Sequence, residues 1–173
     1  LFLLIVCISC CPRAKQVIEP SQVIVTSYPS SIGEAGVAVY LPEGYTRLEQ
    51  DYPVLYLLHG SGDDEAGWLT KGRAKAILDS LITNNLCQPM IVVMPNGCMR
   101  HDAAPTYSGK CDYKPYMSGS MDGSFESYFG DVVAWVDAHY RTYPAKESRA
   151  IAGLSMGGFH AMQISRHYPD MFD

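Results

Sequence analysis

The sequence predicts an α/β fold in which helices cover both faces of a mostly parallel sheet. A near-continuous apolar run at residues 52–58 is typical of a strand that is buried on both faces, and residues 90–94 and 149–152 predict two further buried strands. Two stretches with helical periodicity, residues 72–85 and 124–140, alternate with these runs. Such alternation predicts a doubly wound sheet with right-handed crossovers.

Two further β-rich runs precede the first buried strand. Residues 23–28 and 37–41 are separated by Pro29, Gly33 and Gly36, which predicts an antiparallel pair at a sheet edge. The first helix is expected to bury the face formed by Ala74, Ile77, Leu78, Leu81 and Ile82. The second is expected to bury Tyr128, Val132, Trp135, Val136 and Tyr140. A third helix is expected over residues 157–168, before Pro169.

Composition and charge are those of an ordinary globular domain. The 173 residues are 47% hydrophobic and 18% charged, and the net charge is −5. The chain has no cluster of lysine and arginine, which argues against nucleic acid as a partner. The length allows one domain with a sizeable core.

The first eleven residues form an apolar run that ends in small residues before Pro12. The run is too short to span a bilayer but has the length of the apolar region of a signal peptide. It lacks an initiator Met and a basic start, so we expect the first residues of the leader to be missing. Ser9-Cys10 resembles the end of a bacterial lipobox, which would make Cys10 a lipidated N-terminus, although Cys7 fits that pattern poorly. A buried first strand is the alternative.

These features predict a leader over residues 1–11, a linker over 12–22 and one domain over 23–173. They also predict an exported protein that is periplasmic, secreted or anchored to the outer membrane. Three cysteines remain outside the leader: Cys87, Cys98 and Cys111. Cys98 and Cys111 share a loop and are the favoured pair if one disulfide forms, but spacing leaves the pairing open. No cysteine and histidine spacing suggests zinc, so neither a metal nor a cofactor is expected.

A possible nucleophile stands between the last apolar run and the third helix. Gly153, Ser155 and Gly157 give the pattern G-x-S-x-G between a strand and a helix. A serine on so sharp a turn projects out of the sheet and requires small neighbours two residues away on either side. The helix that follows directs its unpaired N–H groups at the place where an oxyanion would form.

A glycine-rich loop, residues 59–64, follows the first buried strand and is expected at the same sheet edge as Ser155. His59 is expected to shape this turn rather than to act as a base. Asp63 and Asp64 are expected to be solvated turn residues, with cation binding as the alternative. Trp68 is expected to pack rather than to stack on substrate.

The long segment of residues 98–124 is rich in Gly, Ser, Tyr and Pro. A loop of this length in a compact domain is usually functional or disordered. Tyr107, Tyr113 and Tyr116 could line an acyl or aromatic pocket, or they could close a surface loop on itself.

Three blocks in order carry a resemblance to a known family. They are residues 57–60 with the Gly/Asp loop and Trp68, residues 91–97, and residues 153–158. Together they resemble the esterase branch of the α/β-hydrolases, which includes the feruloyl and acetyl-xylan esterases of carbohydrate esterase family 1, esterase D and the mycolyltransferase antigen 85 proteins. The likeness runs over residues 23–173.

The resemblance implies a role for three residues. Ser155 would be the nucleophile, and the backbone N–H groups of Met156 and Ser61 would form the oxyanion hole. The residue pattern agrees, because two loops at one sheet edge can direct two N–H groups at one carbonyl oxygen.

The family also places an acid and then a histidine after the serine. Only 18 residues follow Ser155, and their histidines are His160 and His167. His160 is expected beside or beneath the turn, and His167 lies about 18 Å along the helix. We therefore expect the triad acid and base to lie beyond Asp173, in an α/β-hydrolase domain of which this chain is the N-terminal part.

The main functional hypothesis is a serine carboxylesterase of the feruloyl or acetyl-xylan type, which cleaves acyl groups from plant polysaccharide through an acyl-enzyme. One alternative is acyl transfer to a sugar, as in the antigen 85 relatives. Another is a non-catalytic carbohydrate-binding or structural module, and the 173 residues alone are expected to be poorly active without the acid and base.

Overall fold

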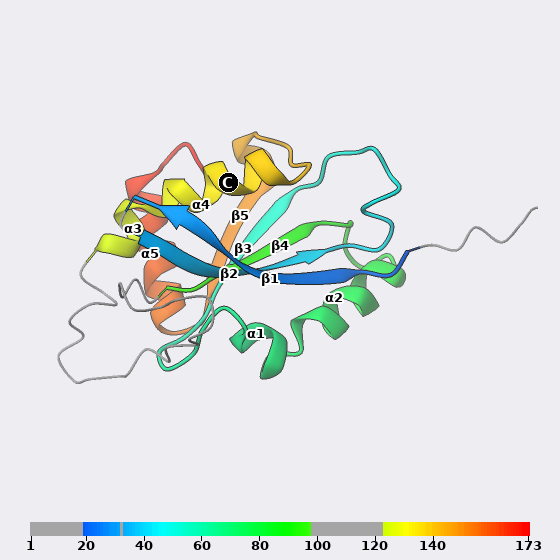
Figure 1. The fold of residues 1–173 in the computed structure, drawn as a ribbon, viewed down its shortest axis with the longest axis horizontal. Coiled ribbons are helices and arrows are strands. Elements are labelled where there is room, and N and C mark those ends of the chain that lie inside the picture. Colours follow the sequence, from blue (N-terminus) through cyan, green and yellow to red (C-terminus); the bar gives the residue numbers. More distant parts are fainter. Residues whose placement is uncertain (1–18, 32, 98–122) are drawn as a thin grey trace, which may run out of the picture.

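The computed structural model describes residues 19–31, 33–97 and 123–173, and these contain one mixed sheet. The strands lie in the order β1-β2-β4-β3-β5 (Figure 1). Their bounds are β1 Gln22–Ser30, β2 Gly33–Leu41, β3 Val54–Leu58, β4 Ile91–Pro95 and β5 Arg149–Gly153.

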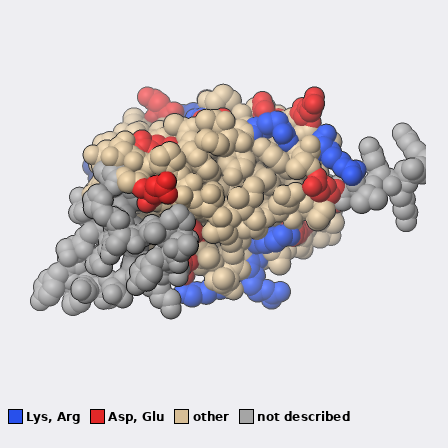
Figure 2. Space-filling view, in the orientation of Figure 1, with Lys and Arg blue, Asp and Glu red and all other residues tan. Residues whose placement is uncertain are grey.

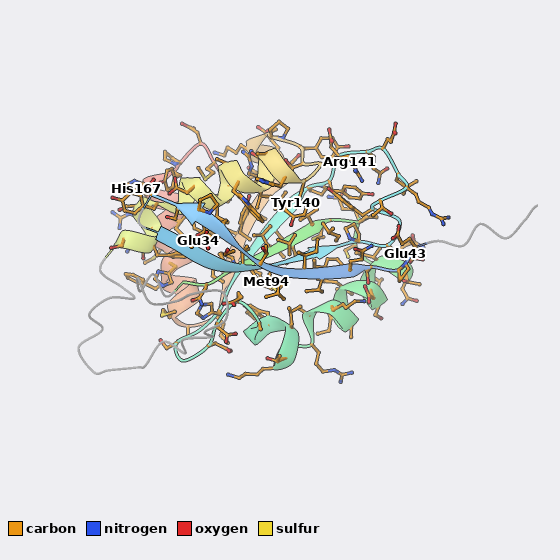
Figure 3. The ribbon with its side chains drawn as sticks, in the orientation of Figure 1. Glu34, Glu43, Met94, Tyr140, Arg141 and His167 are labelled. Carbon is orange, nitrogen blue, oxygen red and sulfur yellow. The ribbon has the colours of Figure 1, made fainter. Side chains whose placement is uncertain are left out.

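Four of the five strands run in the same direction. β3 pairs in parallel with both β4 and β5, whereas β2 is antiparallel to β1 and to β4. Only β2 is therefore reversed, which confirms the mostly parallel sheet and the antiparallel pair. In Figure 3, Glu34 lies near the start of β2 and Glu43 lies just beyond its end. β2 is bonded on both sides, so of the pair β1 alone forms the sheet edge.

Helices cover both faces of the sheet, as predicted (Figure 1). The short helix α1 (Gly67–Thr70) and α2 (Ala74–Thr83) lie on one face. On the other face lie α3 (Ser124–Ser127), α4 (Phe129–His139) and α5 (Met156–His167), and a 3₁₀ turn, η1 (Lys146–Ser148), leads into β5. Within the described residues, no helix is long and apolar enough to cross a bilayer.

Alternate side chains of the central strands enter two different cores. In β3, Val54, Tyr56 and Leu58 belong to the core beneath α3, α4 and α5. Leu55 and Leu57 pack instead with Trp68 and the helices of the other face. Met94 of β4 joins that second core and points toward α1 and α2 (Figure 3). The apolar runs of β3 and β4 therefore reflect strands that are covered on both faces. β5 was expected to be buried, but it is the last strand of the described sheet, and its Ala150 and Ala152 are exposed.

Two helix predictions need correction. Ile77 was expected on the buried face of α2, but 52% of it is exposed, and Ala74 is the only fully buried residue of that helix. The single helix expected over residues 124–140 is divided at Tyr128, which is 38% exposed and departs from helical backbone geometry. The division frees the carbonyl of Ser127, which accepts a hydrogen bond from Tyr168 Oη at 2.6 Å.

Residues 19–22 of the expected linker contact the domain. The Glu19 carbonyl accepts a hydrogen bond from the Gly44 N–H, and Gln22 begins β1. The expected leader, Cys10, Cys98, Cys111 and the three loop tyrosines lie outside the described residues. On the face shown in Figure 2, charged side chains gather around the rim and form no continuous basic patch.

Candidate active site

The turn between β5 and α5 has the strained geometry that the glycine spacing predicted. Ser155 lies at φ 53° and ψ −113°, one of three non-glycine residues with positive φ in the described chain. Such a conformation costs on the order of 1–3 kcal/mol and is common at functional sites. Ser155 occupies the N-cap position of α5, but its side chain makes no capping hydrogen bond and is exposed. Its hydroxyl therefore has no hydrogen-bond partner within the described residues.

The two flanking glycines are required by backbone contacts. A Cβ on Gly153 would lie 2.3 Å from the carbonyl of Gly157, and one on Gly157 would lie 2.4 Å from the Leu58 carbonyl oxygen. Gly157 thus packs α5 directly against the end of β3. Gly158 has more room, since its nearest contact would be 3.3 Å, to the Gly153 carbonyl oxygen.

The loop after β3 touches the turn that carries Ser155. A Cβ on Gly60 would lie 3.7 Å from Cβ of Ser155, and the Leu154 N–H donates to the Leu58 carbonyl at 3.2 Å. The N–H groups of Ser61 and Met156 donate to no acceptor within the described residues. Two loops at the carboxyl ends of β3 and β5 therefore present free N–H groups beside the serine, as an oxyanion hole requires.

His59 supports the oxyanion loop through both ring nitrogens. It is 3% exposed, and its Nδ1 lies 2.8 Å from the Gly60 carbonyl oxygen. Its Nε2 lies 2.9 Å from the Gly97 nitrogen. A carbonyl can only accept and an amide N–H can only donate, so the ring is neutral with its proton on Nδ1. Burial lowers the pKa of His59, and nearby His160 also lowers it, against the opposing effects of the Gly60 carbonyl, Asp63 and Asp64.

This geometry confirms that His59 shapes the turn. Because the peptide group joins the Gly60 carbonyl to the Ser61 N–H in one plane, the hydrogen bond from His59 also fixes the direction of that N–H. Both nitrogens are occupied, so His59 has no lone pair to offer Ser155.

The two aspartates of the same loop have local partners. Asp63 forms an ion pair with Lys71 at 3.2 Å, and Asp64 accepts a hydrogen bond from the Ala66 N–H. Trp68 packs in the second core and donates from Nε1 to the Leu58 carbonyl at 3.0 Å, as expected of a packing residue. A shallow hollow of about 220 Å³ lies between this loop, Trp68 and the exposed Leu154.

The other histidines are not placed to act as a base. His160 is fully buried beneath the turn, as predicted, and His167 lies at the far end of α5 (Figure 3). His139 is exposed on α4, where its ring stacks on Trp135. His160 Nε2 has no partner within the described residues but is buried, and no described histidine is hydrogen-bonded to Ser155.

Sequence reasoning missed the partner of His160. Its Nδ1 lies 2.7 Å from Glu126 Oε1, and Glu126 on α3 is only 6% exposed. Glu126 stands between Phe125 and the aromatic start of α4, and a carboxylate within such an apolar stretch was an available signal.

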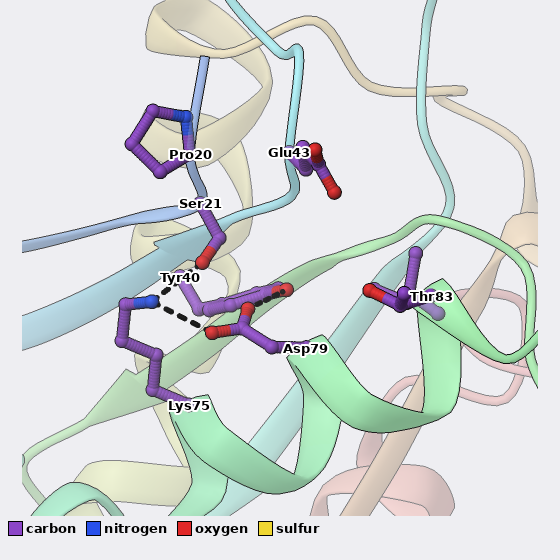
Figure 4. Close-up of a pocket in the computed structure, with 8 residues that line it drawn as sticks. Pro20, Ser21, Tyr40, Glu43, Lys75, Asp79 and Thr83 are labelled. Carbon is purple, nitrogen blue, oxygen red and sulfur yellow. Dashed lines mark hydrogen bonds and ion pairs between the residues drawn. The ribbon is translucent and has the colours of Figure 1, made fainter. Parts of the chain in front are cut away.

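A second hollow, of about 250 Å³, lies at the opposite end of the sheet (Figure 4). Lys75 bonds there to Ser21 Oγ and Asp79, and Asp79 also accepts from Tyr40 Oη at 2.9 Å. These polar groups satisfy one another, and together they fasten the start of β1 to α2. The hollow is therefore a structural contact rather than a candidate site.

The sheet order, the strained serine turn and the oxyanion-type loop define an α/β-hydrolase-type fold. A family model described as "Putative esterase" matches residues 30–173. The chain is 35% identical over 153 residues to an endo-1,4-beta-xylanase/feruloyl esterase of Xylanibacter ruminicola, covering 86% of this chain and 20% of that protein. The chain belongs to this esterase family.

Solved structures agree with that membership. A ferulic acid esterase superposes with a TM-score of 0.70 at 29% identity, over 89% of this chain and 58% of the other. The ferulic acid esterase of Anaeromyces mucronatus, in complex with ferulic acid, gives a TM-score of 0.72 at 23% identity over 94% of this chain and 60% of the other. The chain thus spans a fifth of the xylanase/feruloyl esterase and less than two thirds of these solved chains.

Proposed function

We propose that this chain carries the nucleophile and the oxyanion hole of a serine carboxylesterase. The observation that carries the proposal is the exposed, uncapped Ser155 at φ 53°, in contact with a loop whose Ser61 N–H is free. Ser155 Oγ would attack the ester carbonyl, and the Ser61 and Met156 N–H groups would bind the oxyanion. The alcohol would leave, and water would then release the acid from the acyl-enzyme.

The proton of Ser155 has to pass to a base outside the described residues. His59 has no free nitrogen, and His160 is enclosed by α3 and α5. We propose that the base and its carboxylate partner follow this chain in the longer protein, in the order common to α/β-hydrolases.

The proposed substrate is an acylated plant polysaccharide, with a feruloyl or acetyl group as the acyl part. Support comes from the 35% identity to an endo-1,4-beta-xylanase/feruloyl esterase and the 29% identity to a ferulic acid esterase of the same fold. Tyr107, Tyr113 and Tyr116 remain candidates for contacting the acyl group.

The test is hydrolysis of aryl acetate, methyl ferulate and feruloylated arabinoxylan by the full-length protein. Ser155→Ala should remove activity on all three substrates. Ser165→Ala is the matched control, because Ser165 is exposed on the same helix and bonds only to the Ala161 carbonyl. Full activity of Ser155→Ala would overturn the proposal, and acylated sugar as the main product in the presence of a sugar acceptor would favour acyl transfer.

A further inference from the structure

Glu65 is a buried acid that has no place in the proposed reaction. It follows the oxyanion loop (residues 59–64) directly, lies just before α1 and is only 8% exposed. Its Oε2 accepts a hydrogen bond from Asn96 Nδ2 at 2.8 Å, and Asn96 is 3% exposed. No ion pair of Glu65 is found among the described residues. Burying a carboxyl group is costly, so its place in the interior requires a reason.

The carboxyl group of Glu65 also lies against β2. A Cβ on Gly36 would lie 2.9 Å from Glu65 Cδ and Oε2 and 3.0 Å from Oε1. The Gly36 carbonyl in turn accepts a hydrogen bond from the Asn96 N–H at 2.9 Å. Asn96 is thus bonded to β2 through its backbone and to Glu65 through its side chain. These contacts join β2, the end of β4 and the chain that follows β3.

The oxyanion loop is therefore bound to the end of β4 on both sides of Ser61. On the near side, His59 Nε2 accepts a hydrogen bond from the Gly97 N–H at 2.9 Å. On the far side, Glu65 accepts one from the side chain of Asn96, the residue before Gly97. All four of these residues are buried. Two adjacent residues of β4 and its end thus hold both ends of one loop.

The loop between these two bonds contains residues that do not restrict the backbone. Gly60 and Gly62 have no Cβ, and Gly62 adopts a φ of 76°. An oxyanion donor has to be in position before the reaction begins, so the Ser61 N–H must keep one direction beside Ser155. The bond from His59 fixes the first peptide of the loop, and the bond to Glu65 fixes its far end.

We propose that Glu65 is a positioning residue of the oxyanion hole, which binds the far end of the oxyanion loop to Asn96 and so holds the Ser61 N–H beside Ser155. This inference rests on the proposed function of Ser61 and Ser155. Glu65 acts as the acceptor of the Asn96 hydrogen bond, through which it affects the reaction.

Exchanging the donor and the acceptor tests this role, with kcat and KM for an aryl acetate measured in the full-length protein. Asn96→Asp replaces the NH₂ donor with an oxygen that faces the Glu65 carboxyl group. Its kcat should fall by about tenfold to a hundredfold, which is no more than the loss expected for one oxyanion donor. KM should change little, because the oxyanion forms only in the transition state.

The second variant and the combination of both should reverse this loss. Glu65→Gln keeps an acceptor oxygen opposite Asn96 and should leave kcat near the wild-type value. In the double variant Glu65→Gln/Asn96→Asp, the glutamine NH₂ can donate to the aspartate carboxyl group, so most of the lost kcat should return. Asp64→Ala is the matched control, because Asp64 is the neighbouring acid and accepts a hydrogen bond from the Ala66 N–H of its own turn. Its kcat should stay near that of wild type.

Each result has a defined meaning. Wild-type kcat in Asn96→Asp, no recovery in the double variant, or a loss confined to KM would overturn the inference. If Asn96→Asp does not fold, Glu65→Met removes the acceptor at similar volume, and an unchanged kcat in that variant would overturn it equally. Ser155→Ala separates the two proposals: activity that survives in it overturns the proposed function, whereas its loss beside unchanged kinetics in Asn96→Asp overturns only the role of Glu65.

Discussion

Gly157 and Gly158 offer a sharp test of how the serine turn is built, because neighbouring glycines of one helix have opposite surroundings. An alanine at Gly157 would place Cβ 2.4 Å from the Leu58 carbonyl oxygen and 2.7 Å from that of His59. Both are backbone atoms, so either α5 or the end of β3 has to move. Overpacking of this kind costs typically 1–3 kcal/mol. The gain of about 1 kcal/mol for alanine over glycine in a helix offsets only part of it.

Gly158→Ala gains the same helix propensity without the collision, because its nearest contact is 3.3 Å. Urea unfolding of the full-length protein should therefore show Gly157→Ala less stable than Gly158→Ala by about 2 kcal/mol, because the two variants share the gain in helix propensity and differ by the overpacking, and Gly158→Ala should lie within about 1 kcal/mol of wild type. Gly157→Ala should also lose esterase activity, since Ser155 moves with α5. Equal stability and activity of the two variants would show that the close approach of α5 to β3 does not hold the turn.

Three further changes test other contacts. His59→Ala should lower kcat/KM for aryl esters by about tenfold to a hundredfold, which is no more than the loss expected for one oxyanion donor. His59→Asn should recover part of the lost kcat/KM, because the NH₂ group of asparagine can replace Nδ1 as the donor to the Gly60 carbonyl. Equal kcat/KM values for His59→Ala and His59→Asn would refute the orienting role of His59. Gly36→Ala should reduce the free energy of unfolding by about 1–3 kcal/mol. Its Cβ would lie 2.9 Å from the buried Glu65 carboxyl group, which accepts a hydrogen bond from Asn96 Nδ2. An unchanged denaturation midpoint would contradict this prediction. Burial alone would raise the pKa of Asp79, but hydrogen bonds from Lys75, Ser21 and Tyr40 outweigh burial and lower that pKa. Wild type should therefore have a larger free energy of unfolding than Asp79→Asn above about pH 4, and this difference should shrink as the pH falls below the ordinary aspartate pKa. A difference in unfolding free energy that is independent of pH would refute this role of Asp79.

The sequence predicted the sheet well because burial on two faces leaves a direct mark on composition. The runs containing Val54 and Ile91 are typical of strands in a covered sheet, and the glycines around Ser155 indicated a tight turn. The break at Tyr128 left no such mark, because it depends on Tyr168, which lies forty residues away and donates to the Ser127 carbonyl. Ile77 fits the apolar face by periodicity, but the described residues leave about half of it uncovered, at 52% exposed.

The sequence predicted the separate parts of the candidate site but not the contacts between them. Ser155 and the loop of Ser61 could be identified because each belongs to a motif of only a few consecutive residues. The contact of His59 with Gly97 joins residues 38 positions apart, and that of His160 with Glu126 joins residues 34 apart. Such pairs arise from the crossover of β3, β4 and β5, which sets which loops meet.

Covalent labelling tests the central claim most directly. The full-length protein should react with a fluorophosphonate, and peptide mass spectrometry should place the adduct on Ser155, with none in Ser155→Ala. An adduct on another serine, or hydrolysis of aryl esters that survives in Ser155→Ala, would contradict the account.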